Sequence, residues 1–285
     1  MNELHSVGKD LEIAPDADVG QPSASPFEFA GQRLLRHNTT PHRTIHLWKR
    51  FRNYARVDRA MLPIYPFCTM TGKLITFEGP EGGGKSTQAR LLTEYLRSKG
   101  IRVLTTREPG GTPTGEIIRD LLQNDLSKEP LCDATEALLF CASRAQLCSH
   151  VLAPALERGD WIVLDRFTDS TLAYQGYGRG FDVERLRVLN AFATGPVTPV
   201  LTFLLDIPVQ KGLERAIARS GNKDRIESAP VDFHQRLRDG YLEMARKEPE
   251  RFAIVNATQP IECVSAEIRR ILHVRLNIPG VVASV

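Results

Sequence analysis

The sequence has no long hydrophobic run and no metal-binding cysteine pattern. No apolar stretch approaches the roughly 18 to 20 residues of a membrane-spanning helix, and the N-terminus does not have the basic-then-apolar order of a secretory signal. The five cysteines form no C-x-x-C pair, and the seven histidines are scattered. We therefore expect a cytoplasmic protein without a membrane partner, a disulfide framework or a zinc site, with its cysteines as small reduced core residues.

The sequence also has little net charge. Its 37 basic and 34 acidic residues give a formal net charge of +3, which is too small to indicate a nucleic-acid partner. With 42% hydrophobic and 25% charged residues, the composition is ordinary for a globular protein. The 285 residues can therefore form a sizeable core, in one large or two modest domains.

The composition changes twice within the first seventy residues. Residues 1–28 carry six acids and one lysine and are predicted to be disordered, whereas residues 29–69 carry eight basic residues and one aspartate. This weak basic amphipathic pattern could touch a membrane, nucleic acid or an import receptor, but a solvated tail or a translation start assigned too far upstream is favoured. We predict that residues 1–70 are an extension or a mis-assigned start and that residues 71–278 form the folded domain.

The octapeptide Gly79-Pro80-Glu81-Gly82-Gly83-Gly84-Lys85-Ser86 fits the pattern G-x-x-x-x-G-K-[ST]. A short apolar run precedes it and a helical pattern follows it, as a phosphate-binding loop requires. Backbone N–H groups of such a loop surround an anion, the lysine reaches the outer phosphates and the serine hydroxyl binds Mg²⁺. The motif predicts binding of ATP with Mg²⁺, and the predicted ATP-binding residues are Gly79, Pro80, Glu81, Gly82, Gly83, Gly84, Lys85, Ser86 and Thr87.

Five short apolar runs predict β-strands, and segments with helical spacing lie between them. This order predicts an α/β fold with a doubly wound, five-stranded parallel sheet flanked by helices. Ligands bind such a sheet at the carboxyl ends of its strands. The predicted strands are residues 74–79, 103–107, 161–165, 200–206 and 252–257, and the predicted helices are residues 86–99, 113–123, 133–157, 182–194, 208–219, 231–247 and 260–275.

Residues suited to nucleotide chemistry follow the second and third predicted strands. The runs Arg107-Glu108-Pro109-Gly110-Gly111-Thr112 and Asp165-Arg166-Phe167-Thr168-Asp169-Ser170 both have the composition of phosphate sites. Phe140 and Arg144 lie four residues apart on a predicted helix and hence on one face. Together they could stack a base and hold its edge, whereas each alone is typical of a core aromatic or a solvated helix charge.

These motifs, with Ala173-Tyr174-Gln175-Gly176 and Asp224-Arg225-Ile226-Glu227, resemble the thymidylate kinase family in order and spacing. The resemblance covers about residues 72–275. It implies the architecture of a P-loop nucleoside monophosphate kinase and Mg²⁺-assisted transfer of a phosphoryl group from ATP to thymidine monophosphate (dTMP). The product would be dTDP, on the route to dTTP, and the enzyme a homodimer.

The resemblance also implies roles for individual residues. Glu81 matches a contact to the sugar 3′-hydroxyl, Arg107 matches a contact to the acceptor phosphate, and Phe167 is expected only to pack. Phe140 and Arg144 match the base-stacking ring and the base-edge arginine. Asp165 and Arg166 match groups near the acceptor phosphate and magnesium, while Tyr174 and Gln175 match a segment that closes over the deoxyribose and base. The implied dTMP-binding set is Glu81, Arg107, Phe140, Arg144, Arg166, Tyr174 and Gln175, and the implied metal set is Ser86 and Asp165.

The arrangement of lid arginines resembles the bacterial type of the family. Gly82 and Gly83 stand where the eukaryotic type carries an arginine, and Arg215, Arg219 and Arg225 flank a Ser-Gly-Asn break. The predicted lid spans about residues 215–228, and which of its arginines reaches ATP is left open. The implied catalytic residues are Lys85, Asp165, Arg166, Arg219 and Arg225.

Two alternative functions remain at this level. A kinase for another nucleoside monophosphate would share the P-loop, the lid and the acceptor arginine, but the pair Phe140 and Arg144 argues against it. A catalytically silent nucleotide-binding module with a basic tail is the other alternative. The joint presence of Lys85, Ser86, Asp165 and the lid arginines argues against that one.

Overall fold

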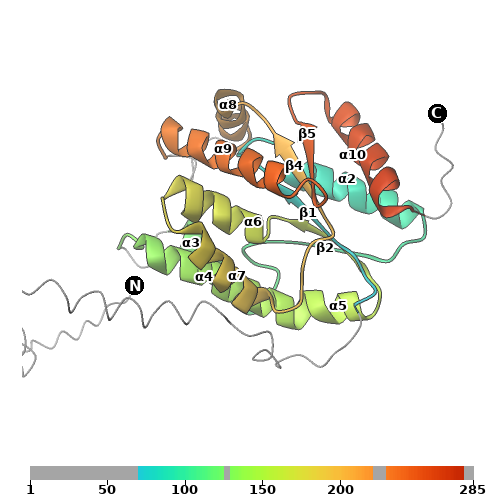
Figure 1. The fold of residues 1–285 in the computed structure, drawn as a ribbon, viewed down its shortest axis with the longest axis horizontal. Helices are drawn as coiled ribbons and strands as arrows, with labels where there is room; N and C mark the ends of the chain where they lie inside the picture. Colours follow the sequence, from blue (N-terminus) through green and yellow to red (C-terminus); the bar gives the residue numbers. More distant parts are fainter. Residues whose placement is uncertain (1–69, 125–128, 221–228, 279–285) are drawn as a thin grey trace, which may run out of the picture. The chain divides into compact units, whose positions relative to one another are not determined.

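Five parallel strands form the centre of the protein in the computed structural model, which describes residues 70–124, 129–220 and 229–278 (Figure 1). The strand order is β2-β3-β1-β4-β5, so the predicted fold class is confirmed. Each predicted strand is found, and its ends differ from the prediction by at most one residue. The strands are β1 (Leu74–Glu78), β2 (Val103–Arg107), β3 (Trp161–Asp165), β4 (Leu201–Asp206) and β5 (Phe252–Asn256).

Helices follow each strand, and seven predicted helical segments are present with small shifts. The predicted helix 133–157 is continuous, but a π-helical segment divides it into three parts. The structure adds a helical stretch over 168–178 that the sequence analysis did not predict. The helices are α2 (Lys85–Ser98), α3 (Pro113–Gln123), α4 (Asp133–Leu147), η3 (Cys148–Leu152), α5 (Ala153–Glu157), α6 (Thr168–Thr171), η4 (Leu172–Gly178), α7 (Val183–Thr194), α8 (Val209–Ser220), α9 (Val231–Lys247) and α10 (Ile261–Leu276).

The hydrophobic core lies on both faces of the sheet, as the uninterrupted apolar strands predicted. Strand β1 is fully buried, and Phe77 of β1 stacks on Phe203 of β4 with ring centroids 5.3 Å apart. Residues of α2 and α10 pack in one buried cluster, and residues of η4, α7 and α9 pack in another. The edge strands β2 and β5 are partly exposed. The centre of the sheet is therefore a rigid base for the loops that follow β1 and β3.

Parallel register brings the carboxyl ends of three strands together. Phe77 of β1 lies opposite Asp165 of β3, and Arg107 of β2 lies opposite the same Asp165. The P-loop follows β1 directly, and chain connections leave the central strands toward opposite edges of the sheet, which creates a crevice at their ends. The three motifs found in the sequence consequently meet at one edge of the sheet.

Within the described ranges no helix is both long and apolar enough to cross a membrane. Four of the cysteines belong to these ranges and are free thiols. Cys141 and Cys148 are buried, as expected, but Cys132 and Cys263 are exposed. The expectation of core cysteines is therefore wrong for these two, because they lie at the start of α4 and on the outer side of the first turns of α10.

Candidate active site

The P-loop wraps around an open space at the start of α2. Gly84 has φ +82° and caps the helix, and a Cβ at Gly84 would have no atom within 4 Å. Gly82 has φ +70°, and a Cβ there would stand 2.0 Å from the carbonyl oxygen of Gly212. Glycine is required at Gly82 for close approach of α8, and at Gly84 it leaves room for a phosphate above the helix N-terminus.

Lys85 points back into the loop. Its Nζ donates hydrogen bonds to the carbonyl oxygens of Gly79 (3.0 Å) and Pro80 (2.8 Å), and the residue is 8% exposed. Burial, aided by the nearby Arg166 charge, lowers the pKa of Lys85 to about 8, although Glu81 and Asp165 oppose the shift. The ammonium is thus held among carbonyl groups where an anion would stabilise its charge.

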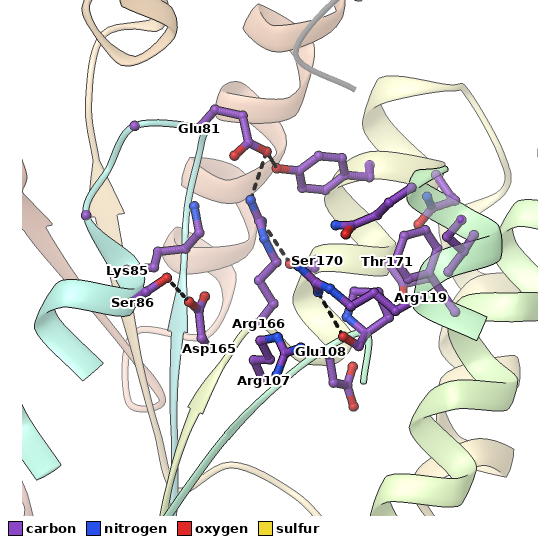
Figure 2. A pocket seen from close by; sticks show the side chains of 18 residues that line it. Glu81, Lys85, Ser86, Arg107, Glu108, Arg119, Asp165, Arg166, Ser170 and Thr171 are labelled. Atoms are coloured by element: carbon purple, nitrogen blue, oxygen red, sulfur yellow. Dashed lines mark hydrogen bonds and ion pairs between the residues drawn. The ribbon is translucent and has the colours of Figure 1, made fainter. Parts of the chain in front are cut away.

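Ser86 and Asp165 form an oxygen pair beside the loop. Ser86 Oγ donates a 2.5 Å hydrogen bond to Asp165 Oδ2, which joins α2 to the end of β3 (Figure 2). No group of three or more His, Cys, Asp or Glu residues suited to a metal occurs in the part of the chain that the structure describes. One hydroxyl and one carboxylate are the hard oxygen donors that Mg²⁺ takes when phosphates and water complete its shell, so the residues present fit this ion.

A pocket of about 230 Å³ opens at the carboxyl ends of β1, β2 and β3 (Figure 2). It unites most residues that the sequence analysis assigned to ATP, dTMP and metal. The predicted residues in its wall are Glu81, Gly82, Gly84, Lys85, Ser86, Arg107, Phe140, Asp165, Arg166, Tyr174 and Gln175, and the others are Glu108, Pro109, Arg119, Leu122, Gln123, Ser170 and Thr171.

Arg166 and Glu81 form an ion pair in the wall of the pocket. Arg166 Nη2 lies 2.8 Å from Glu81 Oε1, the hydroxyl of Tyr174 donates to the same oxygen, and the guanidinium lies 4.9 Å from the centre of the Tyr174 ring. Burial opposes ionisation of Glu81, but the charges of Arg166 and Lys85 outweigh it and lower the pKa of Glu81 to about 2. The wall therefore carries a carboxylate that an arginine and a tyrosine contact directly and that a nearby lysine helps to keep ionised.

Two further guanidinium groups border the same space. Arg107, at the end of β2, is about half exposed and lies 2.8 Å from Glu116 of α3. Arg119, also on α3, donates to the carbonyl oxygen of Pro109 at 2.9 Å. With Arg166 they place three guanidinium groups around one space, and guanidinium groups are suited to binding a phosphate dianion. The sequence analysis missed Arg119 because one arginine in a predicted amphipathic helix looks like a solvated charge.

Phe140 lines the pocket, but Arg144 lies behind the wall. Arg144 is 1% exposed, although its neighbour Thr171, to which it donates, does line the pocket. Its guanidinium pairs with Glu108, since Nε and Nη2 lie 2.9 and 2.7 Å from Glu108 Oε2. Nη1 donates to Thr171 Oγ1 at 2.9 Å and to Asn190 Oδ1 at 2.7 Å. Nη2 also donates to the carbonyl oxygen of Phe167 at 3.0 Å. Its contact with a base edge stays a prediction, and its observed partners belong to the protein. Phe167 is fully buried, as expected for a packing residue.

The remaining predicted residues are not in the pocket wall. Gly79, Pro80, Gly83 and Thr87 belong to the loop and the first turn of α2 but do not border the cavity. Arg219 lies in the last turn of α8, with its side chain outside the described residues, and Arg225 lies outside them altogether. The lid predicted over about 215–228 is therefore described only up to the end of α8.

This combination of sheet, P-loop and facing arginines defines a class of protein, the P-loop phosphotransferases that act on nucleotides. The family model described as thymidylate kinase matches residues 77–268. The chain is 49% identical over 212 residues to a thymidylate kinase of Desulfovibrio desulfuricans, covering 72% of this chain and 97% of the relative. It is 50% identical over 198 residues to a thymidylate kinase of Deinococcus radiodurans, and this match covers 69% of this chain and 94% of the relative.

A solved structure agrees with these sequence relatives. The crystal structure of thymidylate kinase from Ehrlichia chaffeensis aligns with a TM-score of 0.57 and 34% identity, covering 70% of this chain and 98% of that one. The chain belongs to the thymidylate kinase family. The resemblance inferred from the motifs is confirmed.

Proposed function

We propose that the protein transfers the γ-phosphoryl group of ATP to dTMP, giving dTDP and ADP, with Mg²⁺ as cofactor. The observation that carries the proposal is that one pocket is lined by the P-loop lysine, by Asp165 and by three arginines, all inside the range matched by the family. Residues 71–278 carry the activity, and residues 1–70 are an extension to it. Because ATP is a substrate and two exposed cysteines are free thiols, the cytoplasm is the favoured location.

On the donor side, the loop binds the phosphates of ATP. Backbone N–H groups from Gly82 to Ser86 and the N-terminus of α2 provide partial positive charge, and Lys85 leaves its carbonyl partners to reach the outer phosphates. Ser86 and Asp165 would hold Mg²⁺, which supplies charge neutralisation at the oxygens of the transferred group when it is bound.

On the acceptor side, the pocket binds the nucleoside monophosphate. Arg107, Arg119 and Arg166 surround its phosphate, and Phe140 offers a ring face to the base. Glu81 accepts a hydrogen bond from the sugar hydroxyl, a role that its low pKa supports because the carboxylate stays ionised. The acceptor phosphate is already an anion, so the reaction needs alignment and charge neutralisation more than a strong base.

The test is a coupled assay of purified protein with ATP, Mg²⁺ and each nucleoside monophosphate in turn. We expect dTMP to give the highest kcat/KM by at least about tenfold, because Phe140 and the other residues of the pocket wall select the base. Lys85→Ala should remove turnover while the thermal midpoint stays near that of the parent, since this loop lysine adds little to the core. A preference for another monophosphate, or near-normal turnover of Lys85→Ala, would contradict the proposal.

We further propose that the enzyme is a homodimer that pairs through α3, α4 and α7. These helices are neighbours, since α4 contacts both α3 and α7. Each exposes a large apolar side chain, and Phe192 of α7 is 76% exposed. Several such side chains on adjacent helices exceed the single exposed apolar residues that are normal for a monomer. The exposed residues of this face are Ile117, Leu138, Val188 and Phe192.

Sedimentation analysis of two matched variants tests the dimer. Phe192→Asp should shift the protein toward a monomer, because it places a charge in the apolar contact. Val274→Asp, at an equally exposed position on α10, should leave the mass unchanged. A parent that sediments as a monomer, or an equal shift in both variants, would refute this face as the interface.

A further inference from the structure

Glu78, the last residue of β1, is a fully buried carboxylate that the proposed reaction does not use directly. It is 0% exposed and does not border the pocket. Its two oxygens nonetheless accept four hydrogen bonds. Oε1 accepts from the backbone N–H of Phe167 at 2.7 Å and of Ser170 at 3.3 Å, and Oε2 accepts from the hydroxyls of Ser170 at 2.6 Å and Tyr241 at 2.9 Å.

The backbone bonds act on the turn that carries Arg166. Arg166 has φ +68°, in the left-handed region that non-glycine residues seldom adopt and that surrounding contacts must enforce. The turn leads into α6, which has no side-chain cap from its own N-cap residue, Phe167. The carboxylate of Glu78 accepts from the N–H groups of Phe167 and Ser170 in place of such a cap, from 89 residues away in the chain.

The side-chain bonds reach the guanidinium itself. Ser170 Oγ donates to Glu78 and accepts from Arg166 Nη1 at 3.3 Å, so one hydroxyl connects the carboxylate with the arginine. The hydroxyl of Tyr241, on α9, lies 3.0 Å from the same Ser170 Oγ. Glu78 thereby contacts the backbone that follows Arg166, and through Ser170 it is connected to the Arg166 side chain. Tyr241 connects α9 to the same carboxylate.

The surrounding charges fit a restraining role better than a reactive one. Asp169, which also faces Glu78, is already held by Arg251 at 2.6 Å, and the Lys85 ammonium bonds to loop carbonyls. Burial, with Asp169 adding to its effect, raises the pKa of Glu78 to about 7, while Ser170, Arg166 and the Phe167 N–H oppose the rise. A group with four donors in place has no acceptor position left for a substrate.

We propose that Glu78 is a positioning residue for phosphoryl transfer: its carboxylate fixes the left-handed turn at Arg166 and thereby aims the guanidinium into the acceptor pocket, with Tyr241 holding the carboxylate from α9. The inference rests on the proposed role of Arg166 at the acceptor phosphate. Because the role is to hold the turn in place, the length of the side chain at residue 78 should matter more than its charge. Displacing a binding group by about 1 Å can cost about a hundredfold in rate.

Steady-state kinetics of Glu78→Asp, Glu78→Gln and Tyr241→Phe test this. Glu78→Asp keeps the charge but shortens the reach, and should lower kcat/KM for dTMP by about 10- to 100-fold. Glu78→Gln keeps the length of the side chain: its amide oxygen can accept from the two N–H groups while its NH₂ donates to the two hydroxyls. Its kcat/KM for dTMP should therefore fall less than that of Glu78→Asp. Tyr241→Phe removes the hydroxyl that donates to Glu78 and should lower kcat/KM for dTMP several-fold. The KM for ATP should change less than about twofold in all three.

Asp206→Asn is the matched control. Asp206 also ends a strand and also contacts α9, through Arg238 at 2.7 Å, but it forms no hydrogen bond with Arg166 or Ser170 in the described part of the chain. It should lower the thermal midpoint and leave kcat/KM for dTMP unchanged. Should Glu78→Asp fail to fold, Tyr241→Phe decides the question.

Parent-like kcat/KM for dTMP in the variants, or a proportional loss for both substrates that follows the thermal midpoint, would overturn the inference. A larger loss in Glu78→Gln than in Glu78→Asp would also overturn it. Arg166→Ala separates the two proposals. If Arg166→Ala turns over dTMP like the parent, the proposed role of Arg166 fails; if Arg166→Ala is impaired and Glu78→Asp is not, only this inference fails.

Discussion

The positive charge of Lys85 costs free energy, because burial lowers the pKa of its ammonium group to about 8. A bound triphosphate places negative charge beside Nζ and should raise that pKa again. At pH 8 about half of the lysines in the free enzyme are neutral, so ATP binding should take up on the order of half a proton. Isothermal titration calorimetry in buffers of different ionisation enthalpy measures this number.

Lys85→Arg provides the control for that titration, because a guanidinium stays protonated at pH 8 whether or not ATP is present. Proton uptake should disappear in the variant if it still binds ATP. Equal proton uptake by the variant and the parent would show that a group other than Lys85 takes up the proton. The lowered pKa of Lys85 would then no longer support its assignment to the ATP phosphates.

Phe140 is the residue of the base site best suited to substitution, because it lines the pocket. Phe140→Ala should raise the KM for dTMP more than the KM for ATP, since stacking of a base on an aromatic ring is worth about 1 to 3 kcal/mol. Thr135→Ala, at an exposed position of the same helix that belongs neither to the pocket nor to the proposed dimer face, is the matched control and should change neither. An equal change of both KM values in Phe140→Ala would identify Phe140 as a packing residue.

Arg144 illustrates what the sequence could predict about a residue and what it could not. Spacing placed it on the same helical face as Phe140, and the helix is present. Spacing could not reveal that Glu108, Thr171 and Asn190 would occupy its guanidinium, because these partners come from three other segments. Removing Arg144 would leave the Glu108 charge buried without its ion pair, at a cost of about 3 to 5 kcal/mol. Its role in base choice is therefore hard to separate from its role in folding.

At the scale of elements, the predicted strands and most helices agree with the structure because their apolar spacing is strong. The stretch over α6 and η4 was missed for a physical reason. Its residues Thr168–Thr171 have weak helix propensity, and the cap comes from Glu78 on another element. Seven residues of η4 then continue as a π-helix, which has no simple sequence period. Tertiary contacts, rather than local sequence, determine this element.

The lid arginines remain a prediction from the sequence, since Arg225 and the side chain of Arg219 lie outside the described residues. The lid should add positive charge to the phosphates only when both nucleotides are bound. Arg219→Ala or Arg225→Ala should therefore lower kcat by about tenfold to a thousandfold with a modest change in ATP affinity. Steady-state rates and ATP binding measured separately distinguish the two effects.

Lys211→Ala is the matched control for the lid, because Lys211 is an exposed cation on α8. It should leave kcat unchanged, as expected for a solvated helix charge. If both single lid variants and the double variant also turn over like the parent, the bacterial-type lid is refuted. The charge at the transferred phosphate would then have to come from Arg107, Arg119 and Arg166.

At the scale of the whole molecule, the alternation of strands and helices was sufficient to predict the sheet, and the P-loop was sufficient to predict where the ligands bind. The order β2-β3-β1-β4-β5 was not predicted, because it depends on which strands pair across the sheet rather than on any local pattern. The division at residue 70 is likewise a prediction. Relatives are covered over 94 to 97% of their own length while about three tenths of this chain stays outside the match.

The contacts at the start of the folded domain favour a boundary at residue 70. Met70 packs against the buried cluster that contains Leu74 and Leu156, and the N–H of Gly72 donates to the carbonyl oxygen of Leu156 at 2.9 Å. A chain beginning at Met70 keeps these contacts and every motif of the site. We expect its kcat and both KM values to stay within about twofold of the full chain, and its thermal midpoint to shift by less than about 4 °C, equivalent to about 1 kcal/mol for a domain of this size. Calorimetry and the coupled assay compare the two chains directly. A lower rate, aggregation or a larger fall of the midpoint in the shortened chain would show that residues 1–69 stabilise the folded domain or take part in its activity.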